Sequence, residues 1–323
     1  MNNNYTFDNI IDIFNFNFET NIIVYNVNDD ICIYNLRTKE FLLKINLKGI
    51  YINYSMTTQD SKYLIISPDN TFLIIDLVKF TYFIHEIDDN GNNHGILIKN
   101  NGNTITYINY LNNRLEKYDF IEKKIVETID NFEYLKLLKY NPDGKYLIVS
   151  SGDLGKNPTL KVLDSESYEV IFELVEPHKG FIKEIEFSPD GKYLTTTAWE
   201  SDLSNEKDGY LYFTLCSVWD FEKRELKYYL GENFPQKMFT DYNANKVFYS
   251  KDGKYNIVGI DEVIINHIVI FETESGKIVK IFTNDEMDFY YDTSSDHIIY
   301  SVFDNDSNTS TVIVKTLNEM IHS

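Results

Sequence analysis

The residues best suited to binding a partner gather in two segments of the chain. The first, 199–210 (WESDLSNEKDGY), carries four carboxylates against one lysine. The second, 231–245 (GENFPQKMFTDYNAN), carries three aromatic residues and a methionine where the pattern otherwise predicts a loop. An apolar centre with a charged rim is typical of a protein-contact surface. The candidate protein-binding residues are Trp199, Glu200, Asp202, Glu206, Asp208, Phe234, Met238, Phe239 and Tyr242. The alternative is that both segments are tolerated loops without a partner, because loop length costs little free energy.

Residues for catalysis or metal binding form no recognisable pattern in this sequence. The run 304–308 (DNDSN) resembles the first half of a calcium loop, but Thr309 replaces the glycine expected at position six. Position twelve is Lys315 rather than glutamate. The six histidines are scattered, and no Cys/His group has zinc spacing. Neither a G-x-x-x-x-G-K-[ST] phosphate loop nor a G-x-S-x-G elbow occurs. We therefore expect no catalytic residues, no metal site and no cofactor.

The two segments are set in a chain of seven repeats. The plain copies are TTQDSKYLIIS (57–67), YNPDGKYLIVS (140–150), FSPDGKYLTTT (187–197) and YSKDGKYNIVG (249–259). Aligned on the turn, the seven copies mark Thr20, Ser61, Gly102, Gly144, Gly191, Gly253 and Ser295. The intervals between these positions are 41, 41, 42, 47, 62 and 42 residues. A period near 40 residues with strand–turn–strand content is typical of a β-propeller.

The fourth repeat shows the expected unit of four short strands, at 134–140, 145–150, 159–164 and 169–174. Four such antiparallel strands make one propeller blade. The seventh repeat lacks its fourth strand, because only NEMIHS follows Leu317. Residues 5–8 at the other end of the chain are free to fill that place and cover an open sheet edge. The sequence thus predicts an all-β, single-domain fold over 1–323: a seven-bladed β-propeller of four-stranded antiparallel blades, closed by the N-terminal strand.

The composition favours strands and limits the kinds of partner. Only two alanines occur in 323 residues, whereas tyrosine and phenylalanine contribute 25 and 22. Alanine scarcity lowers helix propensity, and aromatic residues favour strands, where we expect most of them to pack between blades. The net charge of −20 disfavours general nucleic-acid binding and anionic membrane surfaces. It suits a protein partner with a basic face.

The ends and cysteines of the chain point to an intracellular, cytoplasmic protein. The N-terminus MNNNYTFDNI lacks the basic and apolar blocks of a signal peptide. No apolar run is long enough to insert into a membrane. The two cysteines, Cys32 and Cys216, lie in different repeats and do not form a disulfide framework, which fits a reducing compartment.

Residues 177–198 (PHKGFIKEIEFSPDGKYLTTTA), followed by 217–226 (SVWDFEKREL), resemble a WD40 repeat. Pro177-His178 occupies the Gly-His position of that family, and Trp219-Asp220 occupies its Trp-Asp position. The full signature occurs once; elsewhere the Trp-Asp position holds Leu163-Asp164, Tyr118-Asp119, Ile75-Asp76 or Phe271-Glu272. The chain thus resembles a divergent WD40 propeller. The resemblance implies seven blades, a protein-binding platform without catalytic residues, and a His–Ser–Asp–Trp network in blade five alone. The SPDGKYL turn also occurs in other propellers, including the lactonase-like ones.

The irregular spacing of the repeats places the two candidate segments on one face. The interval from Gly191 to Gly253 is 62 residues, against 41 to 47 elsewhere. Segment 199–210 lies between strands two and three of blade five, and segment 231–245 joins blade five to blade six. Both kinds of connection leave a propeller on the same face, so we expect the segments to lie side by side, with the smaller irregularity 152–158 on that face too. The first hypothesis is a non-enzymatic adaptor; the alternative is a lactonase-like enzyme or a small-molecule-binding propeller that uses its central channel. The oligomeric state stays open.

Overall fold

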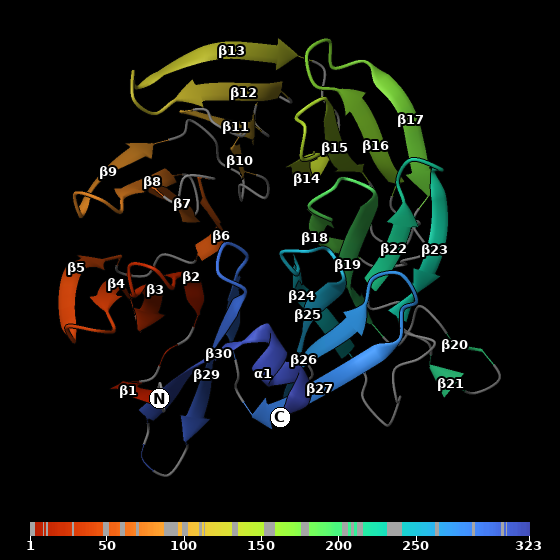
Figure 1. Cartoon of the computed structure of the whole chain (residues 1–323). Helices are drawn as coiled ribbons and strands as arrows, with labels where there is room; N and C mark the ends of the chain where they lie inside the picture. The colour runs from red at the N-terminus through yellow and green to blue at the C-terminus, as the bar shows by residue number, and fades with distance from the viewer. Residues whose placement is uncertain are drawn as a thin grey trace.

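The computed structural model shows β-strands arranged around a ring (Figure 1). It describes residues 4–8, 10, 12–27, 29–47, 52–58, 62–68, 71–86, 96–98, 103–109, 112, 114–130, 135–151, 159–175, 181–201, 206–207, 210–211, 216–230, 241–261, 265–285, 288–304, 307 and 309–323.

Seven four-stranded antiparallel blades follow one another around the ring, which confirms the predicted fold class. Blade one contains β2 (Ile13–Asn17), β3 (Ile22–Val27), β4 (Asp30–Asn35) and β5 (Glu40–Asn46). Blade two contains β6 (Ile52–Thr57), β7 (Tyr63–Pro68), β8 (Thr71–Asp76) and β9 (Thr81–Glu86). Blade three contains β10 (Ile96–Ile98), β11 (Thr104–Asn109), β12 (Arg114–Asp119) and β13 (Lys124–Asp130). Blade four contains β14 (Leu135–Tyr140), β15 (Tyr146–Ser151), β16 (Thr159–Asp164) and β17 (Val170–Val175). Blade five contains β18 (Phe181–Phe187), β19 (Tyr193–Ser201), β22 (Cys216–Asp220) and β23 (Glu225–Tyr229). Blade six contains β24 (Asp241–Tyr249), β25 (Tyr255–Asp261), β26 (Ile265–Glu272) and β27 (Ile278–Asp285). In each of these blades the first strand lies nearest the ring axis and the fourth lies outermost (Figure 1).

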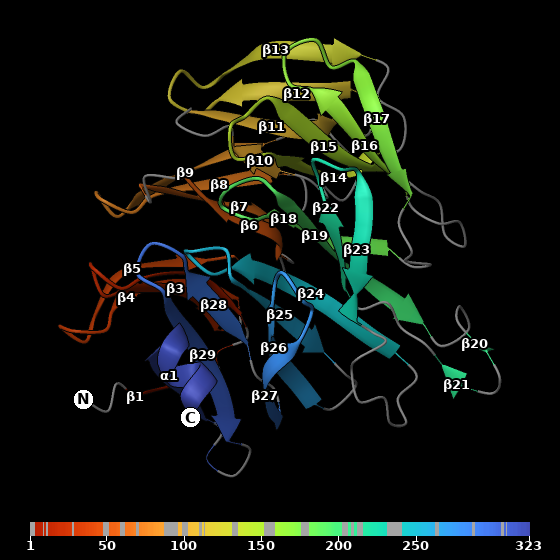
Figure 2. The same ribbon diagram turned by 45° about the vertical axis from the view of Figure 1, so that its right-hand side comes forward.

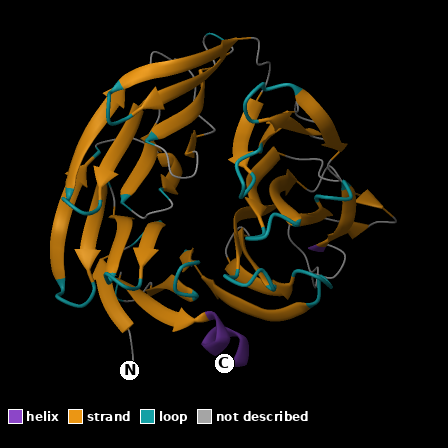
Figure 3. Ribbon diagram, turned by 45° about the horizontal axis from the view of Figure 1, so that its top comes forward, coloured by secondary structure: helices purple, strands orange, loops and turns teal. Residues whose placement is uncertain are grey.

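The seventh blade is completed by the N-terminal strand, as predicted. Its own strands are β28 (Phe289–Asp292), β29 (His297–Asp304) and β30 (Thr309–Thr316), and β1 (Asn4–Asp8) pairs antiparallel with β30. The register runs from Asn4 opposite Ile313 to Asp8 opposite Thr309. The pairing covers the edge of β30 and brings the two ends of the chain to one part of the ring (Figure 3).

The core consists of layers between neighbouring blades, and aromatic side chains fill much of it. Tyr63 and Phe72 of blade two pack against Tyr107 and Tyr118 of blade three. The rings of Phe72 and Tyr107 meet edge to face, with centroids 4.9 Å apart. Each large apolar side chain buried in this way stabilises the ring by roughly 1.5–3 kcal/mol. The expectation that these residues pack between blades holds for this pair of blades.

The turns between strands one and two use backbone in the left-handed region. The plain copies place glycine there: Gly144, Gly191 and Gly253, with φ of 73°, 74° and 71°. In the first and last copies the left-handed residues are Asn21 and Asp296, one position after the aligned Thr20 and Ser295. Asparagine and aspartate tolerate this conformation better than most residues, so they replace glycine. Ser61 and Gly102 lie outside the described residues.

The turns between strands three and four share an acidic or amide cap, which occupies the Asp position of the WD40 signature. In blade two the Asp76 carboxylate accepts hydrogen bonds from the Val78 and Lys79 N–H groups at 3.0 and 2.9 Å. Side chains that accept backbone N–H bonds in the same way end the third strands of other blades: Asn35, Asp119, Asp164 and Asp220. The Asp position is therefore used for turn capping, whether or not tryptophan precedes it.

The same turns contain one residue at positive φ in each of blades one to six: Lys39, Phe80, Lys123, Tyr168, Arg224 and Gly276. In several of these turns this residue contacts the preceding blade. Lys123 of blade three places its ammonium 4.6 Å from the ring centroid of Phe83 in blade two. The Arg224 guanidinium of blade five lies 4.2 Å from the ring centroid of Phe172 in blade four. We call these reach-back contacts; they compensate the cost of left-handed backbone, about 1–2 kcal/mol for a residue other than glycine.

A short helix, α1 (Leu317–His322), follows β30 where the other blades have this turn. The sequence-based prediction missed it and left residues 318–323 without structure. Thr316 caps the helix, accepting from the Glu319 N–H, while the Glu319 carboxylate accepts from the Thr316 N–H. Met320 is fully buried in the core that blades six and seven share, against which Phe282 of β27 also packs. Through Met320, helix α1 of blade seven thus contacts the preceding blade six, as the reach-back contacts do in other blades. Among the described residues, no helix has the length and apolarity needed to cross a bilayer.

Candidate functional site

The two candidate segments meet through backbone pairing. The end of β19 runs beyond blade five and pairs antiparallel with the start of β24, so that Trp199 lies opposite Asn243 and Glu200 opposite Tyr242 (Figure 2). This joins the sheets of blades five and six into one eight-stranded sheet. The start of segment 199–210 and the end of segment 231–245 therefore lie side by side, as strands rather than as the loops the sequence predicted.

The other candidate residues are placed less closely or lie outside the described part of the chain. Glu206 belongs to a separate hairpin of β20 (Glu206–Lys207) and β21 (Tyr210–Leu211), which projects from the ring (Figure 2). Outside the described residues lie Asp202, Asp208, Phe234, Met238 and Phe239, together with the whole segment 152–158. The structure thus brings together Trp199, Glu200 and Tyr242 by their backbones, and the contact surface itself stays a prediction.

A group of three carboxylates around one lysine borders this sheet junction, and sequence reasoning missed it. Asp288, just before β28, accepts from the Lys246 ammonium at 2.6 Å and from the Ile13 N–H at 2.5 Å. It thereby ties together the innermost strands of blades six, seven and one. Asp261, at the end of β25, lies opposite Asn243 in the register that continues to Trp199. We call Asp12, Asp261, Asp288 and Lys246 the mouth cluster.

Burial and mutual repulsion make protonation easier in the mouth cluster. Burial is the largest cause that raises the pKa of Asp261 to about 6, and the negative charge of Asp288 adds to it. Burial, and then Asp288, also raise the pKa of Asp12. Lys246 opposes both shifts through its positive charge. No spacing in the sequence links positions 12, 261 and 288; only closure of the ring brings them together.

The mouth cluster can offer carboxylate oxygens to a cationic group, but its geometry does not support metal chemistry. Within the part of the chain that the structure describes, no three His, Cys, Asp or Glu side chains are placed to hold a metal ion. Asn26 and Asn245 donate to Asp12 and Asp261 at 3.3 and 2.5 Å, which orients these carboxylates.

Polar side chains on the innermost strands satisfy one another across blade boundaries. Lys139 of β14 and Glu186 of β18 form an ion pair at 2.5 Å. Asn15 of blade one donates to the Thr57 hydroxyl at 2.7 Å and to the Tyr290 hydroxyl at 3.4 Å. These contacts link blades four and five, and blades one, two and seven. These contacts tie neighbouring blades together, and the buried Asn15 amide is hydrogen-bonded, as expected for a buried polar group.

The polar network that the WD40 resemblance implies for blade five is described only in part. His178 lies outside the described residues, and Asp220 forms an ion pair with Lys223 at 2.9 Å. A different buried network joins blades five and six: Thr195 lies 2.6 Å from the Tyr249 hydroxyl and donates to Asn256 at 3.2 Å. No known family model matches this chain, and no curated protein shows significant similarity to it. What is shown is a seven-bladed β-propeller.

Proposed function

We propose that this protein is a non-enzymatic interaction scaffold that binds another protein through the face formed by segments 199–210 and 231–245. The observation that carries the proposal is the pairing of β19 with β24, which fuses blades five and six at the base of both segments. A propeller with separate blades would leave two independent loops there. A fused sheet instead provides a rigid base for an extended contact surface.

Charge supports a partner with a basic face. The mouth cluster borders the sheet junction, and segment 199–210 carries four carboxylates against one lysine. With a net charge of −20, the protein attracts basic surfaces over a distance of about 8–10 Å at physiological salt. We further propose that the chain is a divergent WD40-type propeller working in the cytoplasm, on the basis of residues 177–198 and 217–226.

The proposal is tested by recovering partners with the intact protein and with a triple variant, Phe234→Ser, Met238→Ser and Phe239→Ser. Central apolar residues of an interface commonly contribute 2 kcal/mol or more each, so we expect at least about a thirty-fold loss of the stoichiometric partner. The matched control replaces Ile125 and Val126, which are 46% and 48% exposed on the outer strand of blade three, by serine. It should retain the partner. Unchanged recovery with a triple variant that unfolds at the wild-type temperature would refute this site.

A central channel that binds a small molecule is the second candidate, with a lactonase-like enzyme as its catalytic form. The observation that favours it is the polar character of the innermost strands, with Lys139, Glu186 and Asn15 among their side chains. Replacing Lys139 by Met should abolish small-molecule binding at the channel and leave partner recovery unchanged. Loss of the protein partner in that variant, if it still unfolds at the wild-type temperature, would instead show that the two candidate functions share a site.

A further inference from the structure

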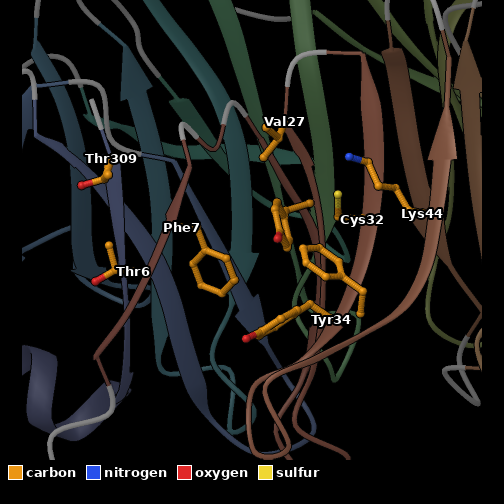
Figure 4. Close-up of a pocket in the computed structure, with 9 residues that line it drawn as sticks. Thr6, Phe7, Val27, Cys32, Tyr34, Lys44 and Thr309 are labelled. Carbon is orange, nitrogen blue, oxygen red and sulfur yellow. The ribbon is translucent and has the colours of Figure 1, made fainter. Parts of the chain in front are cut away.

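A cavity of about 340 Å³ lies at the seam where the ring closes, between the N-terminal strand and blade one (Figure 4). It is on the far side of the ring from the β20–β21 hairpin (Figure 1), so it is independent of the proposed interaction face. Its walls come from β1 and β30 of blade seven and from β3, β4 and β5 of blade one. The lining residues are Thr6, Phe7, Tyr25, Val27, Cys32, Tyr34, Phe41, Lys44 and Thr309.

Four aromatic rings in edge-to-face contact line the cavity. Phe7 meets Tyr25 at 5.2 Å and Tyr34 at 5.1 Å between centroids, and Tyr34 meets Phe41 at 5.1 Å. Tyr25 is buried, whereas Phe41 is 59% exposed. An exposed phenylalanine costs free energy that a bound apolar group would recover. Rings in this arrangement present faces and edges to a flat aromatic guest.

Lys44 is the one charged residue among those that line the cavity. Its ammonium lies 2.7 Å from Asp30 Oδ2, and its side chain is 59% exposed. Asn46 donates to the other Asp30 oxygen at 2.6 Å, so that carboxylate is held in place from two sides. Because the Lys44 side chain is exposed, a guest carboxylate can approach the ammonium and share it with Asp30. The remaining polar groups of the wall are hydroxyls and one buried thiol, which carry no charge.

We propose that this seam cavity binds a small aromatic carboxylate, with its ring among Phe7, Tyr34 and Phe41 and its carboxylate on Lys44. The volume lies at the small end of ligand sites, which span roughly 300–1,000 Å³ and combine apolar walls with a few polar groups. A guest in this place touches β1 from the start of the chain and β3–β5 of the next blade. Binding therefore strengthens the ring closure, and the unfolding temperature rises with the concentration of the guest.

The test uses three probes with one ring system and different charge: indole-3-acetate, indole-3-acetamide and tryptamine. Dissociation constants are measured by titration calorimetry on the full chain. We expect indole-3-acetate to bind about two- to five-fold more tightly than the amide, which is the effect of one partly exposed ion pair. Tryptamine should bind less tightly than indole-3-acetate, because its ammonium cannot accept a hydrogen bond from Lys44, although Asp30 beside Lys44 offsets part of the repulsion.

Two variants separate the roles of charge and ring. Lys44→Gln should remove the preference for acetate over acetamide, and Phe41→Ala should weaken the binding of all three probes. The matched controls are Lys124→Gln, an exposed ion-paired lysine on the outer strand of blade three, and Tyr82→Ala, a 46% exposed ring on the outer strand of blade two. Neither control should change the dissociation constants. The inference is overturned if no probe binds, if tryptamine binds most tightly, or if Lys44→Gln keeps the preference while unfolding at the wild-type temperature.

Discussion

Replacing Gly276 by alanine tests whether reach-back contacts hold neighbouring blades together. Gly276 has φ of 69°, and a Cβ built there would lie 2.9 Å from two carbons of the Tyr228 ring in the preceding blade. The ring cannot easily retreat, because its hydroxyl donates to the Thr273 carbonyl at 2.7 Å. Left-handed backbone costs alanine about 1–2 kcal/mol, and forced overlap in a packed contact adds roughly 1–3 kcal/mol.

Gly191→Ala provides the matched control. Its φ of 74° imposes the same backbone cost, but the nearest atom to its Cβ would be Pro142 Cδ at 3.6 Å, an ordinary contact. In urea unfolding we expect Gly276→Ala to lower the free energy of unfolding by about 1–3 kcal/mol more than Gly191→Ala. In a Tyr228→Ala background the two alanine substitutions should cost the same. Equal losses in the wild-type background would refute the reach-back contact as a stabilising element.

Three further predictions concern the mouth cluster, the seam and the C-terminus. The pKa of Asp261 is about 6 in the folded protein, against an ordinary 3.8. Between these two pH values the folded protein therefore holds a proton that the unfolded chain has already released. The contribution of Asp261 to stability should therefore fall as the pH rises from 3.8 to about 6. In urea unfolding, Asp261→Asn should be more stable than wild type at about pH 8 but not at about pH 4. Removing residues 1–8 should expose the edge of β30, lower the unfolding temperature and produce oligomers in size-exclusion chromatography, whereas a monomer of unchanged stability would contradict the closure. Met320→Ala should cost roughly 2–5 kcal/mol by urea unfolding, because this side chain is fully buried between blades six and seven; a loss below that of an exposed alanine substitution would show that α1 is dispensable.

The repeat period was sufficient to predict the blades because each blade is built from neighbouring strands joined by short turns. The third strand of blade four was predicted at 159–164 and is β16 (Thr159–Asp164). Closure was predictable because the seventh repeat lacks a fourth strand after Leu317, while residues 5–8 form a strand that belongs to no other repeat and can take its place. Helix α1 was not predicted because six residues are too few to show a helical periodicity, although the capping pair Thr316 and Glu319 was visible in the sequence.

The candidate site was less predictable because its geometry depends on contacts between distant parts of the chain. Segment 199–210 was expected to be a loop, yet its first residues extend β19 and pair with β24. The mouth cluster joins positions 12, 246, 261 and 288, and no local pattern marks any of them. The left-handed backbone of Phe80 and Tyr168 could not be predicted from the sequence either, because bulky residues rarely adopt positive φ unless packing compensates the strain.

The reach-back contacts all run from a blade to the blade that precedes it in the chain. Lys123 touches blade two, Arg224 touches blade four, and Gly276 lies against blade five, so these three blades are each secured by the blade made after them. During synthesis on the ribosome, the outer strand of each of these blades therefore becomes fully packed only when the next repeat has been made. The first strand to emerge, β1, waits longest, since its partner β30 is made just over 300 residues later. A circular permutant that begins at β2 and places β1 after α1 would remove that delay, and its refolding rate would reveal how much of the folding time the wait occupies.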